Sequence, residues 1–149
     1  MAKAKSSKKK REKAKKTYSF ATGKRKRAVA RAKVEAGKGK ITINSKPLDI
    51  WANEVLCLWV KEPLIIAGDL VKSVDITANV KGGGVSGQAE AVRVAISRGL
   101  VKFSKDKKLR EKFMEYDRNL LVYDPRRTEP HKPSRSRKGA RRHKQRSKR

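Results

Sequence analysis

The chain has 149 residues, the size of one ordinary domain, so we expect a single hydrophobic core. Its 42 lysines and arginines against 14 aspartates and glutamates give a formal charge of +28, which would repel itself unless a polyanion such as a nucleic acid neutralised it. The apolar stretches fall far below the roughly 20 residues that span a bilayer, and the lysine-rich start lacks the apolar middle of a secretory signal, so we expect neither membrane insertion nor export.

The positive charge is concentrated at the ends of the chain. Residues 1–16 contain nine bases and one acid, residues 17–33 six bases and no acid, and residues 126–149 twelve bases and one acid. Residues 34–125, with fifteen bases and twelve acids, have the mixed charge of a globular domain. The ends have too few apolar side chains to offset the entropy of ordering. We therefore expect a disordered basic extension at 1–16, a globular domain at 17–125 and an extended basic tail at 126–149; a solubilising extension or a localisation signal is the alternative for such tails.

Alternation with period two predicts a strand at residues 27–35. Its inward face is small and apolar, and its outward face is basic, as a strand lying against a phosphate backbone requires; a solvated face is the alternative. The inward residues are Ala28, Ala30, Ala32 and Val34, and the outward bases are Arg27, Arg31 and Lys33. A turn at 36–39 and renewed alternation at 40–44 predict a hairpin between the two strands.

A helix is predicted from Pro47 to Val60. Trp51, Val55 and Trp59 recur at four-residue spacing, which favours core packing over base stacking. Pro63 is expected to end or kink this helix. Because Cys57 is the only cysteine and stands among apolar residues, we expect it to pack as a small apolar side chain.

The second half of the domain reads as a strand at 74–80, a glycine loop, an amphipathic helix at 88–103, a charged helix at 105–117 and a closing strand at 119–124. The helix at 88–103 places its apolar residues on one face and its polar residues on another. The apolar set is Val92, Ile96, Gly99 and Phe103, the polar set is Glu90, Arg93 and Ser97, and the next helix has Leu109, Phe113 and Tyr116. Together these elements predict an α+β domain.

Gly82, Gly84 and Gly87 satisfy the G-x-G-x-x-G pattern between a strand and a helix. A dinucleotide site also needs an acid about 20 residues on, at the end of the next strand, and that distance reaches only Asp106 in a charged linker. We therefore expect no dinucleotide enzyme. The glycines suit either a tight turn or the approach of an RNA phosphate to the helix N-terminus, where Lys81 adds charge.

No other catalytic constellation is found. His131 and His143 lie in the basic tail without cysteine or paired carboxylates nearby, so we expect them to add hydrogen bonds to RNA.

Several longer motifs together resemble one protein family. They are TGKRKRAVARAKV, GKGKITINSKPL, VKGGGVSGQAEAVRVAISRGL, DPRRTEPHKPSRSRKGAR and the terminal SKR, in order from about Tyr18 to Arg149. The chain resembles the small-subunit ribosomal protein nine family, and its lysine-rich start and EPHKP segment are similar to archaeal members. The KPSRSRKG stretch departs from the family pattern.

This resemblance implies a two-layer α+β domain with a four-stranded mixed sheet and packed helices, bound to ribosomal RNA in the head of the small subunit. It also implies a tail that reaches towards the transfer RNA in the peptidyl site, neighbouring proteins of the head as partners, and a place in the cytoplasmic ribosome. We expect no cofactor, metal, membrane or small-molecule substrate, and a structural rather than catalytic role. A general basic, chromatin-like nucleic-acid-binding protein is the alternative.

The candidate RNA-binding residues follow from both sources. The resemblance carries over the basic first strand (Lys24, Arg25, Lys26, Arg27 and Arg31) and the glycine loop (Gly82, Gly83, Gly84, Gly87 and Gln88). Charge adds Lys33, Lys81, Arg126, Arg127, Lys132, Arg135, Arg137, Lys138, Arg141, Arg142, Lys144 and Arg146. Ser147, Lys148 and Arg149 are the residues that the resemblance places nearest the transfer RNA.

Overall fold

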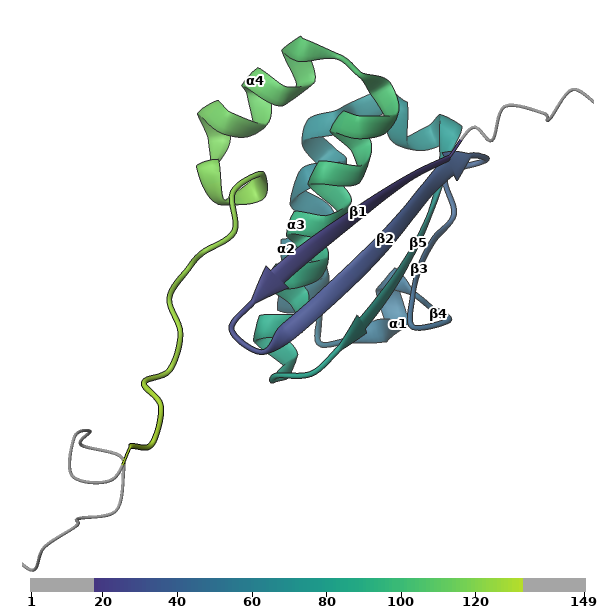
Figure 1. The fold of residues 1–149 in the computed structure, drawn as a ribbon. Helices are drawn as coiled ribbons and strands as arrows, with labels where there is room; N and C mark the ends of the chain where they lie inside the picture. The colour runs from purple at the N-terminus through teal and green to yellow at the C-terminus, as the bar shows by residue number, and fades with distance from the viewer. Residues whose placement is uncertain (1–17, 133–149) are drawn as a thin grey trace, which may run out of the picture.

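A computed structural model describes residues 18–132 of the chain. These residues form one mixed sheet with helices on one face (Figure 1). The sheet has five strands in the order β1-β2-β5-β3-β4. The strands are β1 (Tyr18–Arg25), β2 (Ala28–Ala36), β3 (Ile41–Ile43), β4 (Lys46–Pro47) and β5 (Val74–Lys81). The helices are α1 (Leu48–Trp51), α2 (Glu54–Ala67), α3 (Val85–Ser104) and α4 (Lys107–Tyr116), with 3₁₀ turns at Gly68–Ser73 and Arg118–Leu120.

The expected α+β class with a mixed sheet is confirmed. Strands β1, β2 and β5 pair antiparallel, whereas β3 pairs parallel with β5. The sheet has five strands rather than four because a two-residue strand, β4, extends its β3 edge. Among the described residues, no helix is both long enough and apolar enough to cross a membrane.

The predicted hairpin between residues 27–35 and 40–44 is wrong because β5 lies between β2 and β3. The connection at 37–40 crosses the start of β5 and is held there by Asp75, whose Oδ1 accepts the backbone N–H groups of Lys38 and Lys40, each at 2.8 Å. These bonds, that of Lys40 foremost, lower the pKa of Asp75 below its ordinary value. A side chain at Gly37 would collide with the same carboxylate.

Two further strand expectations fail at the edge of the sheet. Strand β1, which was not predicted, pairs along its whole length with β2 and occupies one edge. The predicted closing strand at 119–124 is absent: Asp117 accepts the N–H of Asn119 at 2.8 Å and starts a 3₁₀ turn. Leu120 is buried in the core from this turn, so the apolar character of the segment reflects docking rather than strand pairing.

Strand β2 and the close packing beneath it are the centre of the core. Ala28, Ala30, Ala32 and Val34 are fully buried, as the alternation predicted. Helix α3 packs directly on this face and on β1 (Figure 1). The approach is so close that a Cβ at Gly23 would lie 2.0 Å from the carbonyl oxygen of Ala91, and one at Gly99 2.7 Å from a methyl of Val34.

The predicted helix at 47–60 differs from the structure in its bounds and in its buried face. It is broken between α1 and α2, and α2 continues through Pro63 to Ala67. The side chains of α2 that enter the core are Cys57, Val60, Pro63 and Leu64. Trp51 packs against the core, but Val55 and Trp59 are exposed, so the four-residue spacing marked the wrong face for them. Cys57 is buried as expected, and its thiol donates to the carbonyl of Leu48 at 3.1 Å.

Helices α3 and α4 mostly follow their predicted pattern. Val92, Ile96 and Gly99 are buried and Phe103 packs against the core; Leu109 and Phe113 of α4 are buried, while Tyr116 is exposed. The prediction was wrong for Ser97, which is fully buried and donates to the Arg93 carbonyl at 2.8 Å. Ser97 is buried because α3 is covered by the sheet on one side and by α2 and α4 on others.

Candidate nucleic-acid interface

Two loops meet at one end of the sheet. The β1–β2 turn at residues 26–27 and the glycine loop at residues 82–84 lie side by side at the start of α3 (Figure 1). A Cβ at Gly82 would be 2.7 Å from the Arg27 carbonyl oxygen, and one at Gly83 would be 3.0 Å from the backbone nitrogen of Ala28. Lys81 stands opposite Val29 in the register of β2 and β5. This contact joins bases from both segments into one cluster.

The glycines of the loop differ in their backbone angles and in the space around them. Gly82 and Gly83 have φ values of 80° and 69° and press against the β1–β2 turn, so both are required by the turn itself. Gly84 is different: its φ is negative, and an added Cβ would have no atom within 4 Å. It is the N-cap of α3 and provides no side-chain hydrogen bond to the helix. Gln88 closes the loop by donating to the Gly82 carbonyl at 3.1 Å, and a Cβ added at Gly87 would lie 3.7 Å from the Arg25 carbonyl oxygen.

We define the basic corner as Lys24, Lys26, Arg27 and Lys81 around the N-terminus of α3. All four side chains belong to exposed residues, and none forms an ion pair within residues 18–132. The first turn of α3 contains no acid, whereas α1 and α2 begin with Asp49 and Glu54. The helix dipole and four uncompensated cations therefore act together at this corner, which favours a phosphate.

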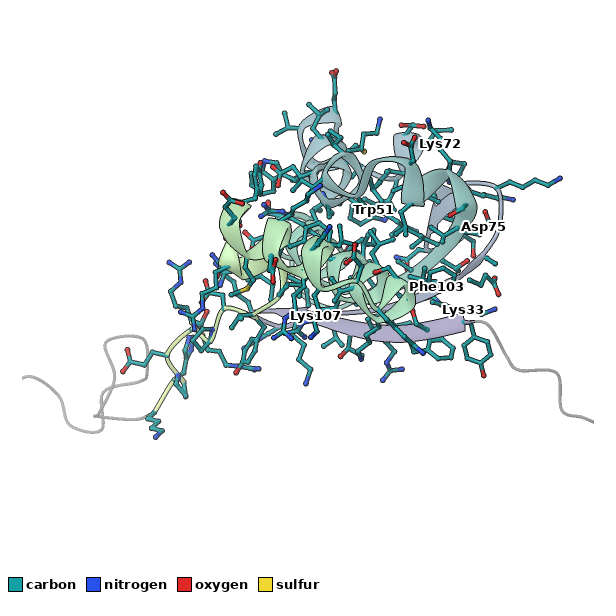
Figure 2. All side chains as sticks on the ribbon, turned by 90° about the horizontal axis from the view of Figure 1, so that it is seen from above. Lys33, Trp51, Lys72, Asp75, Phe103 and Lys107 are labelled. Carbon is teal, nitrogen blue, oxygen red and sulfur yellow. The ribbon has the colours of Figure 1, made fainter. Side chains whose placement is uncertain are left out.

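The uncovered face of the sheet continues from the basic corner. Figure 2 shows the helices on one side of the sheet only, with side chains, including Lys33, projecting from the strands. Arg31 is exposed between Thr22 and Asn79 on neighbouring strands. Lys33 pairs with Glu35 at 2.6 Å and lies 5.6 Å from the centre of the Tyr18 ring. The charge of Lys33 is therefore partly neutralised within the domain.

Sequence reasoning missed two aromatic residues on this face. Phe20 is 60% exposed, and its ring meets that of Tyr18 edge to face at 5.2 Å. Exposed rings beside bases offer stacking surfaces to unpaired nucleotides. The signal was present as alternation in YSFATGKR, but the large residues of this strand point outward and the small ones inward, the reverse of an ordinary edge strand.

Arg25 faces the opposite way from its basic neighbours. Its side chain is only 13% exposed; it pairs with Glu90 of α3 and, at 2.9 Å, with Asp124. Asp124 also binds Arg126 through two side-chain contacts at 2.5 and 2.7 Å and accepts its backbone N–H at 2.8 Å. Arg126 first, and Arg25 to a smaller extent, lower the pKa of Asp124 to about 2. Arg25 thus anchors the segment that leads to the C-terminal tail.

A second arginine fastens the same segment. Arg98 of α3 donates to the carbonyl of Leu121 at 2.7 Å and to that of Thr22 at 2.8 Å, joining the segment to β1. Beyond this point Arg127, His131 and Lys132 are exposed residues in a stretch without helix or strand. The remaining candidates lie outside the described residues: Arg135, Arg137, Lys138, Arg141, Arg142, His143, Lys144, Arg146, Ser147, Lys148 and Arg149, together with the expected extension at 1–16.

Residues 18–132 contain no group of three or more histidine, cysteine, aspartate or glutamate side chains that could hold a metal ion. Asp106, the acid nearest to the spacing of a dinucleotide site, is the N-cap of α4 and accepts the N–H of Lys108 at 2.9 Å.

The fold and the basic corner define a class: an α+β protein with a cluster of unpaired bases at one end of its sheet and a basic C-terminal sequence. The family model described as Ribosomal protein S9/S16 matches residues 23–149. The small ribosomal subunit protein uS9 of Methanococcus maripaludis strain C7 is 47% identical over 111 residues, covering 74% of this chain and 83% of that protein. The uS9 protein of Methanococcus vannielii is 46% identical over the same coverage. The chain belongs to the ribosomal protein S9/S16 family, as its motifs indicated, and is similar to archaeal members.

Proposed function

We propose that this protein is a structural constituent of the small ribosomal subunit that binds ribosomal RNA through the basic corner and the adjoining open face of the sheet. Membership of the family supports the assignment to the small ribosomal subunit, the location in the cytoplasmic ribosome and a role without catalysis. The main support for the RNA interface is that four unpaired cations lie close to the N-terminus of α3, which has no side-chain cap. Phosphate contacts supply the affinity, and the shape of the folded RNA supplies the preference.

A substitution at Gly84 separates RNA binding from folding. We expect Gly84→Asp to keep or raise the melting temperature, because aspartate caps a helix N-terminus well. The same charge should weaken binding to a transcript of the head domain of small-subunit RNA by roughly fivefold, since it repels the phosphate. Asn53→Asp is the matched control: it adds the same charge at the exposed N-cap of α2, away from the corner. If both variants weakened RNA binding equally, the effect would come from net charge alone, and the basic corner would not be the binding site.

The salt dependence of binding tests the same interface. Each of Lys24→Gln, Lys26→Gln and Lys81→Gln should reduce the slope of log affinity against log salt by about 1. Lys107→Gln is the control, because Lys107 begins α4 at the far end of α3, a helix of 20 residues and so about 30 Å long. A chromatin-like protein would bind any duplex of the same length equally well, whereas we expect the head-domain transcript to be preferred at moderate salt.

The tail is proposed to serve a second RNA. We infer that residues 126–149 form an extended basic tail and that Lys148 and Arg149 lie nearest the transfer RNA in the peptidyl site. Removing residues 147–149 should leave folding and incorporation into the subunit intact and weaken retention of peptidyl-site transfer RNA on filters. The double variant Lys148→Gln/Arg149→Gln keeps the length and should weaken it similarly. Failure of the truncated chain to assemble would make the tail an assembly element instead.

A further inference from the structure

The outer surface of α1 and α2 is unusually apolar for a water-exposed face. We define the apolar face as Ile50, Val55, Leu58, Trp59 and Ile65, which are exposed by 75, 61, 52, 38 and 74%. On α2 these residues recur at helical spacing on the side opposite to the core residues. A helix that is apolar on both sides is typical of one covered on both sides. Within residues 18–132, nothing covers the outer side.

The charge around this face is the opposite of the charge of the chain. Residues 48–69 contain four acids, Asp49, Glu54, Glu62 and Asp69, and a single base, Lys61, in a protein of net charge +28. Lys61 is held by Asp49 at 2.6 Å, which raises the pKa of the lysine. Glu54 forms no ion pair with any residue of the described part of the chain. Glu62 and Asp69 are paired with bases that lie outside this stretch, Arg93 and Lys72, so Glu54 is the acid of this stretch that keeps an unpaired charge among the described residues. An RNA backbone would meet no unpaired cation of residues 48–69 and would be repelled by Glu54.

The chain itself provides no cover for the apolar face. Residues 1–17 and 133–149 contain no valine, isoleucine, leucine or aromatic residue that could fill it. A second copy of the protein would bring the same acids and a second charge of +28 against it, since a twofold interface pairs identical surfaces. The remaining occupant is a different protein.

We propose that the apolar face docks another protein of the same particle, through a segment that carries apolar side chains flanked by lysine or arginine. A shallow, open hollow of about 410 Å³ adjoins the face. Its lining combines apolar side chains (Leu64, Ile65 and Val71) with the charged groups of Lys61, Asp69 and Lys72. Apolar burial would supply the affinity, and the unpaired Glu54 would favour a lysine or arginine beside the apolar side chains of the partner. This inference rests on the proposed function only for the identity of the particle.

Photo-crosslinking in assembled small subunits tests the proposal directly. Benzoylphenylalanine is introduced at Leu58 in the full-length protein and, in a separate variant, at Val85, which is 57% exposed beside the basic corner. We expect Leu58→benzoylphenylalanine to crosslink to a protein peptide that contains both apolar and basic residues, and the Val85 probe to crosslink to RNA.

The two probes keep the two proposals apart. A Leu58 probe that reaches RNA, a second copy of this chain or nothing would overturn the docking surface. A Val85 probe that misses RNA while the Leu58 probe captures such a peptide would remove the proposed RNA interface and leave the docking surface standing.

A variant that introduces charge on the apolar face gives an independent measure. Leu58→Glu/Ile65→Glu changes two exposed side chains, so the protein should still fold. Its affinity for the isolated head-domain transcript should stay within roughly twofold of that of the wild type. Retention in purified subunits during a high-salt wash should fall at least tenfold, because salt leaves apolar contacts in place while weakening phosphate contacts. Met114→Glu/Tyr116→Glu makes the same change on exposed residues of α4 and should be retained. Equal retention of both double variants would contradict the proposal.

Discussion

Asn44 shows how a single side chain extends a strand. Its φ of 48° ends β3 in a tight turn, and its backbone N–H donates to the Ala78 carbonyl at 2.9 Å. The side chain then takes the place of a further strand residue: Nδ2 donates to the Val80 carbonyl at 3.1 Å, and Oδ1 accepts the Val80 N–H at 2.8 Å. Because β3 has only three residues, its pairing with β5 depends strongly on these bonds.

We expect Asn44→Ala to lower the free energy of unfolding by about 2–3 kcal/mol, since it removes both bonds to Val80 and places a Cβ residue without them in the left-handed region. Asn44→Gly is the control, because glycine adopts this φ freely and loses only the side-chain bonds, for a cost of about 1–2 kcal/mol. Urea denaturation of the full chain measures both. A glycine variant as stable as the wild type would show that the side-chain bonds add nothing.

At the scale of elements, the domain depends on how closely α3 approaches the sheet. Small residues line both sides of this contact: Gly23 faces Ala91 and Ala95 of α3, and the alanines of β2 are buried. Close packing of backbone on backbone leaves no space that a relaxed side chain could use.

Gly23→Ala is therefore expected to destabilise the protein by about 1–3 kcal/mol, and its melting temperature should fall by roughly 5–15 °C. The added methyl group would sit against the backbone of α3, which cannot yield without shifting the helix. Gly84→Ala is the comparison, since open space surrounds that glycine. Differential scanning calorimetry distinguishes them, and a Gly23 variant that melts with the wild type would refute the tight contact.

This close packing also explains which elements were predictable from sequence. Strand β2 was recognised because its inward residues alternate as Ala28, Ala30, Ala32 and Val34. Strand β1 was missed because its inward residues are small, Ser19, Ala21 and Gly23, while its rings point to solvent. On α2 both faces are apolar, so periodicity alone could not tell the core face from the exposed one. The hairpin failed because local alternation carries no information about β5, which enters between the strands from later in the chain.

The candidate site was predictable in its residue types and not in its grouping. The family resemblance singled out Lys24 to Arg27, and charge added Lys81, but only the register of β2 against β5 brings the two segments together. Alternation separates neighbours as well: Lys24 reaches solvent, whereas Arg25 turns inward to Glu90 and Asp124. A count of bases treats both residues alike, although one is free for a phosphate and the other already has carboxylate partners.

At the scale of the whole molecule, Asp124 connects the folded domain to the basic tail. Its lowered pKa means that the anchor is fully present above the ordinary value of 3.8 and is lost as the pH falls through about 2. As the pH falls through about 2 the carboxyl group gains a proton and releases Arg25 and Arg126.

We expect the amide resonance of Arg126 to keep its native position above pH 4 and to move in a transition centred near pH 2, because its N–H donates to Asp124. In Asp124→Asn the movement should be absent, and the segment after Leu121 should be cut faster by protease at neutral pH. NMR titration and limited proteolysis measure these effects. A transition that survives in the asparagine variant would assign it to another carboxyl group.

The crossing of residues 37–40 over β5 dictates an order of assembly for the growing chain. A hairpin of β1 and β2 forms from neighbouring residues, but β3 cannot join the sheet until β5 has been synthesised, some 30 residues later. Until then the inner edge of β2 has no hydrogen-bonding partner, and loop-closure entropy opposes the missing pairing. The middle strand of the sheet is thus the last strand to be synthesised, and the sheet is complete only when residues up to Lys81 are available. The core closes later still, because α3 and Leu120 follow β5 in the chain.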